Sequence, residues 1–290
     1  MDKNLQVKLD PVLQRVKSAL IEKELLSLNK KLVMQKKTFV ATLANDFIST
    51  KINLDGFYEK IELELFNKFI HSHKVFKGNA IDVGANIGNH SLFFCKYFKK
   101  IYAFEPNPNI FDILVFNSKN KNIYPINKGL GQIKKYALLK QNLHNLGGSS
   151  IKIDQIYNSN VKIDIEKIDD FKFDGKISFI KIDVEGYEYE VLKGAINKLK
   201  KDKPLIWLEQ SHNDFDEQEK TKSLEMLKEL GYRFFHVKKK NLKQFSLKNI
   251  FIKFINFILN THIENVDSYF LSESKISRDF HYMILAIAKS

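Results

Sequence analysis

The stretch that decides the fold is IDVGANIGNHS at residues 81–91. It opens with apolar residues around Asp82, and two glycines, Gly84 and Gly88, follow four positions apart. An apolar run bounded by glycines is typical of a buried strand that ends in a tight turn. The helical pattern after the turn would leave free backbone N–H groups there, and such groups bind anions. The stretch therefore predicts a strand–turn–helix unit whose turn either holds a ligand or only reverses the chain.

Strand and helix patterns alternate along the chain after residue 78. Apolar strands are predicted at 78–85, 101–108, 122–131, 176–186 and 204–210, with helical spacing between them. Two last strands are predicted near the end of the chain, at 232–239 and 282–290. This alternation indicates an α/β fold of the Rossmann-like kind, with a doubly wound, mostly parallel, seven-stranded sheet.

The rest of the sequence is organised around this predicted sheet. Apolar residues at helical spacing indicate an N-terminal helical extension at 1–74, ahead of an α/β domain at 75–290. Short alternating pieces between 133 and 168 predict extra strands and a loop around NLGGSS. An insert at about 240–265 separates the last two strands.

Composition limits the classes of protein to consider. The single cysteine, Cys95, allows no disulfide within the chain, which suits a reducing compartment. Neither a signal peptide nor a long apolar span is evident, so we expect a cytoplasmic protein. The net charge of +13 comes mostly from scattered lysines. It is either a compositional bias or a field that attracts polyanions. Arginine is scarce and nucleic-acid motifs are missing, so no nucleic-acid partner is expected.

Four acidic residues are predicted at one edge of the sheet. Asp82, Glu105, Asp183 and Glu209 each fall at or near the end of a predicted strand. Ligands of open α/β sheets bind at the carboxyl ends of the strands, near the point where the strand order reverses. The sequence therefore predicts a ligand site lined by these acids.

The ligand can be narrowed from the residues at the turn. The spacing departs from the G-x-G-x-x-G of dinucleotide sites, because Asn86 stands where a close glycine would be. A helix N-terminus suits a carboxylate, Asp82 suits an ammonium group, and Glu105 suits two ribose hydroxyls. A ligand with an amino-acid end and a ribose is S-adenosylmethionine. The alternative is a tight turn with no ligand.

Several segments in order resemble one known family. IDVGANIGNHS, YAFEPNP, NLGGSS, IKIDVEGYEYEVLKGA and PLIWLEQ are similar to the FkbM-type S-adenosylmethionine-dependent methyltransferases, and LDGFYEK at 54–60 resembles the lead-in to that domain. The resemblance covers about residues 54–235. It implies a class I methyltransferase fold and methyl transfer, usually to a hydroxyl group of a sugar, glycan or natural product.

The resemblance also implies roles for individual residues. Residues of DVGANIGN would contact the methionine part of the cofactor, namely Asp82, Gly84, Ala85, Asn86 and Gly88. Glu105 would bind the ribose, with Pro106 and Asn107 beside it. The acid that the family often places near the adenine is missing from NKGLGQ at 127–132, so Asn127 or the backbone is the candidate there.

Methyl transfer to a hydroxyl needs a group that removes the proton. Asp183 and Glu185 are the first candidates, because period-two alternation would place both side chains on the same side of an extended segment. The pair would act as a base or bind a cation such as Mg²⁺. Glu185 alternatively caps the next helix. Glu209 and His212 follow the fifth strand and are further candidates, although a lone histidine in a loop is commonly a surface residue.

These features together predict an O-methyltransferase that acts on a sugar, nucleotide-sugar or lipid-linked glycan acceptor, as in surface polysaccharide or lipooligosaccharide modification. The alternatives are a natural-product O-methyltransferase and a methyltransferase-like subunit without catalysis. The apolar segment 247–263, next to a lysine cluster, is either a buried or dimer-forming helix or a peripheral contact with the inner face of a membrane. A homo-oligomer is a further expectation.

Overall fold

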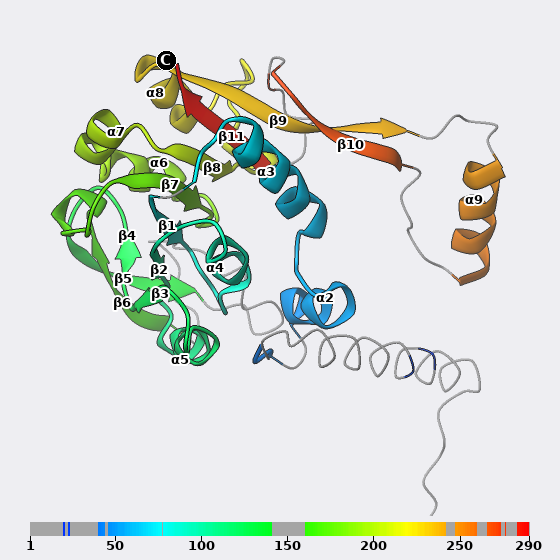
Figure 1. The fold of residues 1–290 in the computed structure, drawn as a ribbon, viewed down its shortest axis with the longest axis horizontal. Coiled ribbons are helices and arrows are strands. Elements are labelled where there is room, and N and C mark those ends of the chain that lie inside the picture. The colour runs from blue at the N-terminus through cyan, green and yellow to red at the C-terminus, as the bar shows by residue number, and fades with distance from the viewer. Residues whose placement is uncertain are drawn as a thin grey trace, which may run out of the picture.

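The computed structural model describes residues 20, 23, 40–43, 46–76, 78–140, 160–241, 247–259, 266–273, 276 and 283–289 of the chain. Most of the predicted N-terminal extension and the NLGGSS loop lie outside the described residues. The described part is an α/β fold around one large sheet (Figure 1).

The large sheet has eight strands in the order β10-β9-β11-β8-β7-β1-β2-β3. The strands from β8 to β3 in this order are parallel, and β11, β9 and β10 add antiparallel pairs. The strands are β1 (Asn79–Val83), β2 (Ile101–Phe104), β3 (Ile123–Ile126), β7 (Ile177–Ile182), β8 (Leu205–Glu209), β9 (Tyr232–Asn241), β10 (Val266–Ser272) and β11 (Met283–Ala288). The predicted Rossmann-like class is confirmed.

One strand of the large sheet was not predicted. The sequence predicts seven strands and a long insert between the last two, whereas the insert itself returns as β10 and pairs antiparallel with β9. In β10, VDSYFLS, the apolar residues are broken by polar ones, and this short segment gives a weak pattern at the edge of a sheet. The eighth strand therefore extends the edge beyond the predicted sheet.

A second, three-stranded sheet lies between β3 and β7 in the chain and has the order β4-β6-β5. Its strands are β4 (Gly129–Leu130), β5 (Lys135–Lys140) and β6 (Asn160–Glu166), and β5 pairs antiparallel with β6. The extra strands predicted between 133 and 168 are thus present. Leu139, Ile163 and Ile165 form a small buried cluster of their own beneath this sheet.

Helices cover both faces of the large sheet. Side chains alternate along the strands, so that Phe179 packs in one core cluster and Ile180 in the other. One cluster joins the sheet to α3 and α4, and the other joins it to α6, α7 and α8. The helices are α2 (Phe47–Asp55), α3 (Lys60–Ser72), α4 (Asn89–Phe94), α5 (Pro108–Asn117), α6 (Glu188–Lys193), α7 (Ile196–Asp202), α8 (Lys222–Glu229) and α9 (Leu247–Leu259), with short 3₁₀ turns η3 (Ile168–Asp170) and η4 (His212–Asp214).

The α3 helix packs inside the core, although the boundary expected at residue 74 places it in the extension. Its apolar stripe includes Phe66, whose ring centroid lies 4.7 Å from that of Phe179 and 5.4 Å from that of Trp207. Such aromatic contacts add to the free energy of burial. The described N-terminal residues therefore contribute to the same core as the sheet.

The strand order reverses next to β1, where the chain returns from β3 through the small sheet to β7. Register places Asp82 of β1 opposite Lys181 of β7, and Val83 opposite Ile182. The carboxyl ends of β1, β2, β7 and β8 meet at one edge of the sheet on either side of this point. That edge is where open α/β sheets bind ligands.

Candidate active site

A cleft opens at the carboxyl ends of these strands. It is lined by residues of the turns after β1, β2, β7 and β8, by the small sheet and by the residues at the start of α2 and just before α3. Its lining residues include Tyr58, Glu59, Gly84, Ala85, Asn86, Asn89, His90, Glu105, Pro106, Asn107, Leu130, Leu139, Lys181, Asp183, Glu185, Tyr187 and Glu209.

The turn after β1 is held against β2 by backbone hydrogen bonds. The N–H groups of Gly84 and Ala85 both donate to the carbonyl of Phe104, at 3.0 and 2.9 Å. Gly84 has a φ of +75°, and a Cβ at this position would collide with the backbone oxygen of Asp183. Glycine is therefore required here for two reasons, since it allows both the left-handed backbone and the close approach of the next strand end.

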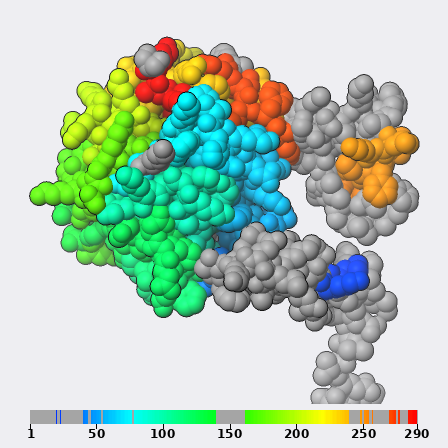
Figure 2. Space-filling model, viewed as in Figure 1, coloured from blue at the N-terminus to red at the C-terminus, as the bar shows by residue number. Residues whose placement is uncertain are grey.

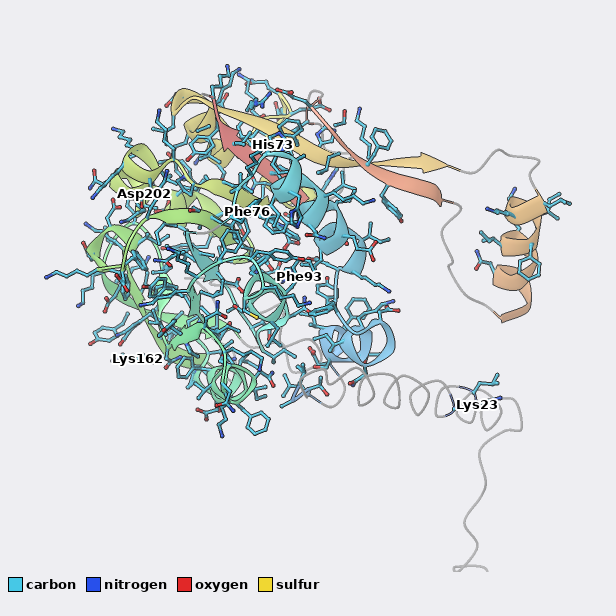
Figure 3. The ribbon with its side chains drawn as sticks, viewed as in Figure 1. Lys23, His73, Phe76, Phe93, Lys162 and Asp202 are labelled. Carbon is cyan, nitrogen blue, oxygen red and sulfur yellow. The ribbon has the colours of Figure 1, made fainter. Side chains whose placement is uncertain are left out.

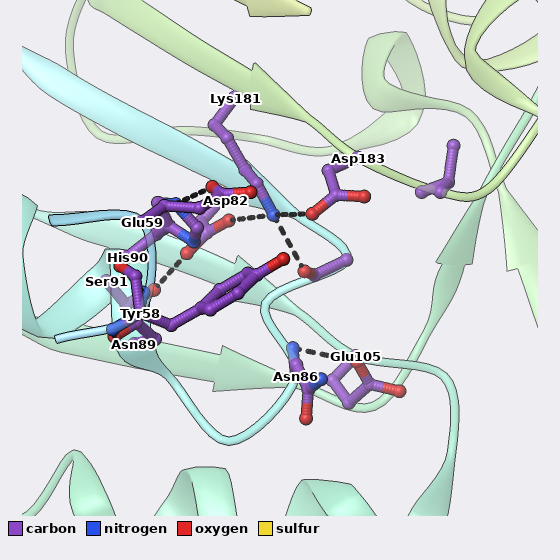
Figure 4. Close-up of polar contacts among 12 residues, drawn as sticks. Tyr58, Glu59, Asp82, Asn86, Asn89, His90, Ser91, Glu105, Lys181 and Asp183 are labelled. Carbon is purple, nitrogen blue, oxygen red and sulfur yellow. Dashed lines mark hydrogen bonds and ion pairs between the residues drawn. The ribbon is translucent and has the colours of Figure 1, made fainter. Parts of the chain in front are cut away.

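Glu105 lies buried at the end of β2, and both of its carboxylate oxygens are held by the backbone. Oε2 accepts the N–H of Asn86 at 2.9 Å (Figure 4), and Oε1 accepts the N–H of Asn107 at 2.9 Å. Burial raises the pKa of Glu105 to about 7, against the opposing effect of these two N–H groups and of the Lys181 charge. A carboxylate has about four lone-pair sites, so two remain for further donors.

Lys181 is a buried lysine at the centre of the acidic edge. Its ammonium lies 2.9 Å from Oδ2 of Asp183 and 3.6 Å from Oδ1 of Asp82, and it donates to the carbonyl of Gly84 at 3.0 Å (Figure 4). Burial lowers the pKa of this lysine, but the charges of Asp183 and Asp82 outweigh burial and raise it above its ordinary value. Lys181 is therefore charged, and it ties the ends of β1 and β7 together.

Asp183 and Glu209 form a pair of carboxyl groups joined by a hydrogen bond. Burial works to raise the pKa of Asp183, but the Lys181 charge and the hydrogen bond from Glu209 outweigh it and lower this pKa. Burial and the Asp183 charge raise the pKa of Glu209 well above its ordinary value. These effects favour the ionised form of Asp183 and the protonated form of Glu209.

The wall opposite this pair comes from the N-terminal part of the chain. The amide of Asn89 binds both the N–H and the carbonyl of Tyr58, at 3.0 and 3.1 Å, which fixes this segment to α4. Glu59 Oε2 lies 3.0 Å from Nε2 of His90. Burial, followed by the charges of Glu59, Glu209 and Asp183, raises the pKa of Tyr58, so its hydroxyl remains a neutral donor. In Figure 4 this hydroxyl points towards the Lys181 ammonium.

The structure brings most of the predicted site residues to the cleft. Gly84, Ala85, Asn86, Glu105, Pro106, Asn107, Asp183, Glu185 and Glu209 all line it. Four others do not, namely Asp82, Gly88, Asn127 and His212.

Each of these four is placed by a local contact. Asp82 is fully buried and accepts a hydrogen bond of 2.6 Å from Ser91. Gly88, with a φ of +95°, starts α4. The amide of Asn127 donates to the carbonyls of Glu105 and Pro106, so it supports the turn after β2. His212 is exposed on η4.

The expectation that Asp183 and Glu185 share one side of an extended segment is wrong. The strand β7 ends at Ile182, and Glu185 has a left-handed φ of 52°, so period-two alternation does not apply. Glu185 is exposed at the rim. Its turn is held instead by Glu188, whose Oε1 accepts the N–H groups of Val184 and Gly186 at 3.2 and 3.0 Å. Within the described part of the chain, no three His, Cys, Asp or Glu side chains are grouped so as to hold a metal ion.

Sequence reasoning missed three groups of lining residues. Lys181 carried a readable signal, because a lysine inside a buried strand must find an acidic partner and Asp183 follows two positions later. Tyr58, Glu59 and His90 carried none, since their meeting depends on how α3 packs. Leu130, Leu139 and Tyr187 close the cleft from the small sheet and the turn after β7.

Comparison with known proteins decides the family. The model of the methyltransferase FkbM domain matches residues 82–234, more than half of the chain. The chain belongs to the FkbM methyltransferase family. The matched region begins at Asp82 and contains the turn after β1, Glu105, Lys181, Asp183 and Glu209.

Individual relatives match only part of this chain. The hexuronic acid methyltransferase AglP of Haloferax volcanii is 31% identical over 126 residues, which are 41% of this chain and 50% of that protein. The chain thus spans about half the length of the curated relative that it matches. Among solved structures, an FkbM methyltransferase from Methylobacillus flagellatus KT is 23% identical and covers 46% of this chain and 32% of its own, with a TM-score of 0.34. A Streptococcus mutans protein in complex with SAH is 15% identical and covers 79% and 99%, with a TM-score of 0.39.

The residues of the cleft fit S-adenosylmethionine, the methyl donor of the family. Glu105 keeps lone pairs for two ribose hydroxyls, and apolar Leu130 and Leu139 also line the cleft. Gly84 leaves the turn after β1 without a side chain. An amino-acid end would lie near this turn, and an adenine would lie near the small sheet.

Proposed function

We propose that this FkbM-family protein transfers a methyl group from S-adenosylmethionine to a hydroxyl group of a sugar. The observation that carries the proposal is that Asp183, whose carboxylate lies 2.9 Å from the Lys181 ammonium, lines the same cleft as Glu209 and Glu105. Methyl transfer needs an acceptor oxygen aligned with the methyl group and a group that takes its proton. The bound cofactor supplies the methyl group on a sulfonium that is already a good leaving group.

Individual residues of the cleft would accept the proton, orient the proton acceptor and bind the substrates. Asp183, ionised beside Lys181, accepts the hydroxyl proton. Glu209 keeps its proton and donates a hydrogen bond to Asp183, which holds that carboxylate in one orientation. Tyr58 remains a neutral phenol that can donate a hydrogen bond to an acceptor oxygen. Glu105 orients the ribose of the cofactor.

The cleft also bears on whether methyl transfer depends on Mg²⁺. Asp183 and Glu185 are the predicted ligands, but Glu185 is exposed at the rim and the Lys181 ammonium already lies 2.9 Å from Asp183. We therefore propose that this lysine supplies the positive charge that a magnesium ion would bring. Turnover that is unchanged by EDTA and by added MgCl₂ supports this, and turnover that needs MgCl₂ contradicts it.

A sugar acceptor is favoured over a natural product by the relationship to AglP, which is named for a hexuronic acid. The acceptor would reach the enzyme as a nucleotide sugar or a lipid-linked glycan. A subunit without catalysis is disfavoured because Asp183, Glu209 and Glu105 are all directed at one cleft. A homo-oligomer remains a prediction that these contacts do not bear on.

Two measurements in sequence test the proposal. Calorimetric titration of S-adenosylmethionine into the protein and into a Glu105→Ala variant should give micromolar binding that the variant loses. Release of S-adenosylhomocysteine is then measured with a panel of nucleotide sugars and extracted lipid-linked glycans, and with catechols and small polyketides as controls. Turnover with the control panel and not with any sugar would overturn the choice of acceptor. Absence of cofactor binding would overturn the methyltransferase activity itself.

A further inference from the structure

The α9 helix is a feature that methyl transfer does not require. The strands β9 and β10 pair up to Asn241 and Val266, so α9 lies beyond the end of this hairpin. Figures 1 and 2 show it apart from the main sheet. Its side chains stand clear of the body of the molecule in Figure 3.

The exposed side of α9 is strongly apolar. Leu247, Ile250 and Phe251 are 85%, 55% and 64% exposed. Positions separated by three and four residues share a face of a helix, so these three side chains form one surface. Contiguous exposed apolar surface of this kind marks a site of contact with a protein or a membrane.

The charge around this apolar face is of one sign. From residue 238 to residue 263 the sequence carries lysines and no aspartate or glutamate; the lysines are Lys238, Lys239, Lys240, Lys243, Lys248 and Lys253. Within α9, Lys253 shares the side opposite the apolar face with Asn256, by helical periodicity. Lysines beside an apolar helical face are attracted to the negative surface of anionic lipids.

We propose that α9 docks on the surface of a bilayer that contains anionic lipids. The apolar face of α9 would enter the boundary between headgroups and acyl chains, and the lysines would lie at the level of the phosphates. The helix has 13 residues, so at about 1.5 Å per residue it is shorter than the roughly 30 Å hydrocarbon core. None of the helices described in the structure has the length and apolar character to cross a membrane. The docked helix would therefore lie in the plane of the surface.

A membrane explains this surface better than a protein partner does. Lysine is depleted from protein–protein interfaces, whereas here lysines flank the apolar face. A second copy of the chain on a two-fold axis would bring the same lysine-rich surface against itself. Like charges would then oppose one another across the interface. An anionic bilayer matches both the apolar face and the sign of the charge.

Co-sedimentation of the full chain with vesicles tests the proposal without any knowledge of the acceptor. We expect binding to vesicles of phosphatidylcholine mixed with phosphatidylglycerol, and at least tenfold weaker binding to phosphatidylcholine alone. Raising the salt concentration should weaken the binding to the anionic vesicles, because salt screens the lysine charges. Light scattering of the same protein in solution reports whether it forms a dimer.

Matched variants locate the contact. Ile250→Glu and Phe251→Glu should each reduce partitioning on anionic vesicles about tenfold or more, since each removes an apolar side chain from the docked face and adds a negative charge. Ile133→Glu and Phe116→Glu introduce the same charge at apolar residues that are 54% and 53% exposed elsewhere. These two controls should bind as the unaltered protein does.

Three outcomes would overturn the proposal. The first is no binding of the unaltered protein to the anionic vesicles, and the second is equal binding to neutral and anionic vesicles. The third is equal loss of binding in the α9 variants and in the controls. A dimer that Phe251→Glu dissociates, in a protein that does not bind vesicles, would assign the face to a second copy. None of these results bears on cofactor binding, so the methyltransferase proposal is tested separately.

Discussion

The two halves of the cleft are held in different ways. The half around Glu105 is fixed by backbone hydrogen bonds. The N–H groups of Asn86 and Asn107 donate to the Glu105 carboxylate, and those of Gly84 and Ala85 donate to the end of β2. The half around Asp183 is fixed by side-chain charges, because the Lys181 ammonium lies between the carboxylates of Asp82 and Asp183.

This difference has a chemical consequence. The half around Glu105, which is built by the backbone, presents a fixed shape, and this suits a cofactor that is the same in every turnover. A charge-built half sets the protonation states that proton transfer depends on. Substitutions should therefore change affinity for the cofactor in the first half, and turnover or folding stability in the second.

Asp183→Asn should produce the largest effect on activity. The substitution keeps the shape of the side chain but removes the carboxylate that accepts the proton, so kcat/KM should fall by about 10²–10⁴-fold. Affinity for S-adenosylmethionine should stay within about threefold, because the Glu105 turn is untouched. Release of S-adenosylhomocysteine and calorimetry measure the two quantities.

A control for this variant is Asp112→Asn on the exposed surface of α5, which should leave both quantities unchanged. A protein in which Asp183→Asn keeps its turnover would have its base elsewhere, with Glu185 as the next candidate in the cleft. Equal loss of cofactor affinity would show that the two halves are not separable.

Lys181→Met should have the largest effect on folding stability. The change leaves the fully buried Asp82 and the half-buried Asp183 without their counter-charge, which costs about 3–5 kcal/mol in the free energy of unfolding. At 2–4 °C per kcal/mol for a domain of this size, the melting temperature should fall by roughly 10 °C. Thermal unfolding followed by circular dichroism measures it.

The matched control is Lys100→Met. Lys100 also bonds an aspartate, Asp174, at 2.5 Å, but both side chains are open to solvent. Exposed pairs add little to stability, so its melting temperature should barely change. Equal effects of the two lysine variants would contradict the account of the Asp183 half as a buried, charge-built site.

The same contrast explains what the sequence could predict. Gly84 and Glu105 were found because a turn and a strand end are local patterns. The eighth strand was missed because its edge position gives a weak pattern. For His212 the sequence left both a catalytic and a surface position open, because a position after a strand does not specify which way a loop turns, and the structure leaves His212 exposed on η4. The meeting of Tyr58 with Asp183 joins segments that only tertiary packing brings together.

Glu105→Gln should weaken the binding of S-adenosylmethionine without affecting proton transfer to Asp183. An amide nitrogen replaces one acceptor oxygen, and hydrogen bonds to a charged group contribute about 1.5–3 kcal/mol, so the affinity should fall by roughly 10–100-fold. Turnover at saturating cofactor should remain within a few-fold of the unaltered protein. A fall in turnover without a change in affinity would move Glu105 to the other half of the cleft.

The pH dependence of cofactor affinity tests the same residue by a different route. The ionised form of Glu105 accepts the ribose hydroxyls, and burial raises its pKa to about 7. Protonation below that pH removes acceptor sites, so affinity should fall as the pH drops from 8 to 6, by at most about tenfold per pH unit. Above pH 8 it should level off. The Glu105→Gln variant should show a flat profile over this range, and a slope in the variant would assign the titration to another group.

Tyr58→Phe should give the smallest effect, and it asks whether the N-terminal wall belongs to the charge-built half. The ring remains to fill the wall, so only the hydroxyl donor is lost, which costs about 0.5–1.5 kcal/mol, or roughly 3–10-fold in kcat/KM. Cofactor affinity should not change, because the Tyr58 hydroxyl points towards the Lys181 ammonium rather than towards Glu105 (Figure 4). A change in KM for the acceptor with kcat preserved would assign the hydroxyl to acceptor binding alone. A loss confined to cofactor affinity would instead mean that the segment before α3 closes over the donor, and the division of the cleft into two independently built halves would fail at this wall.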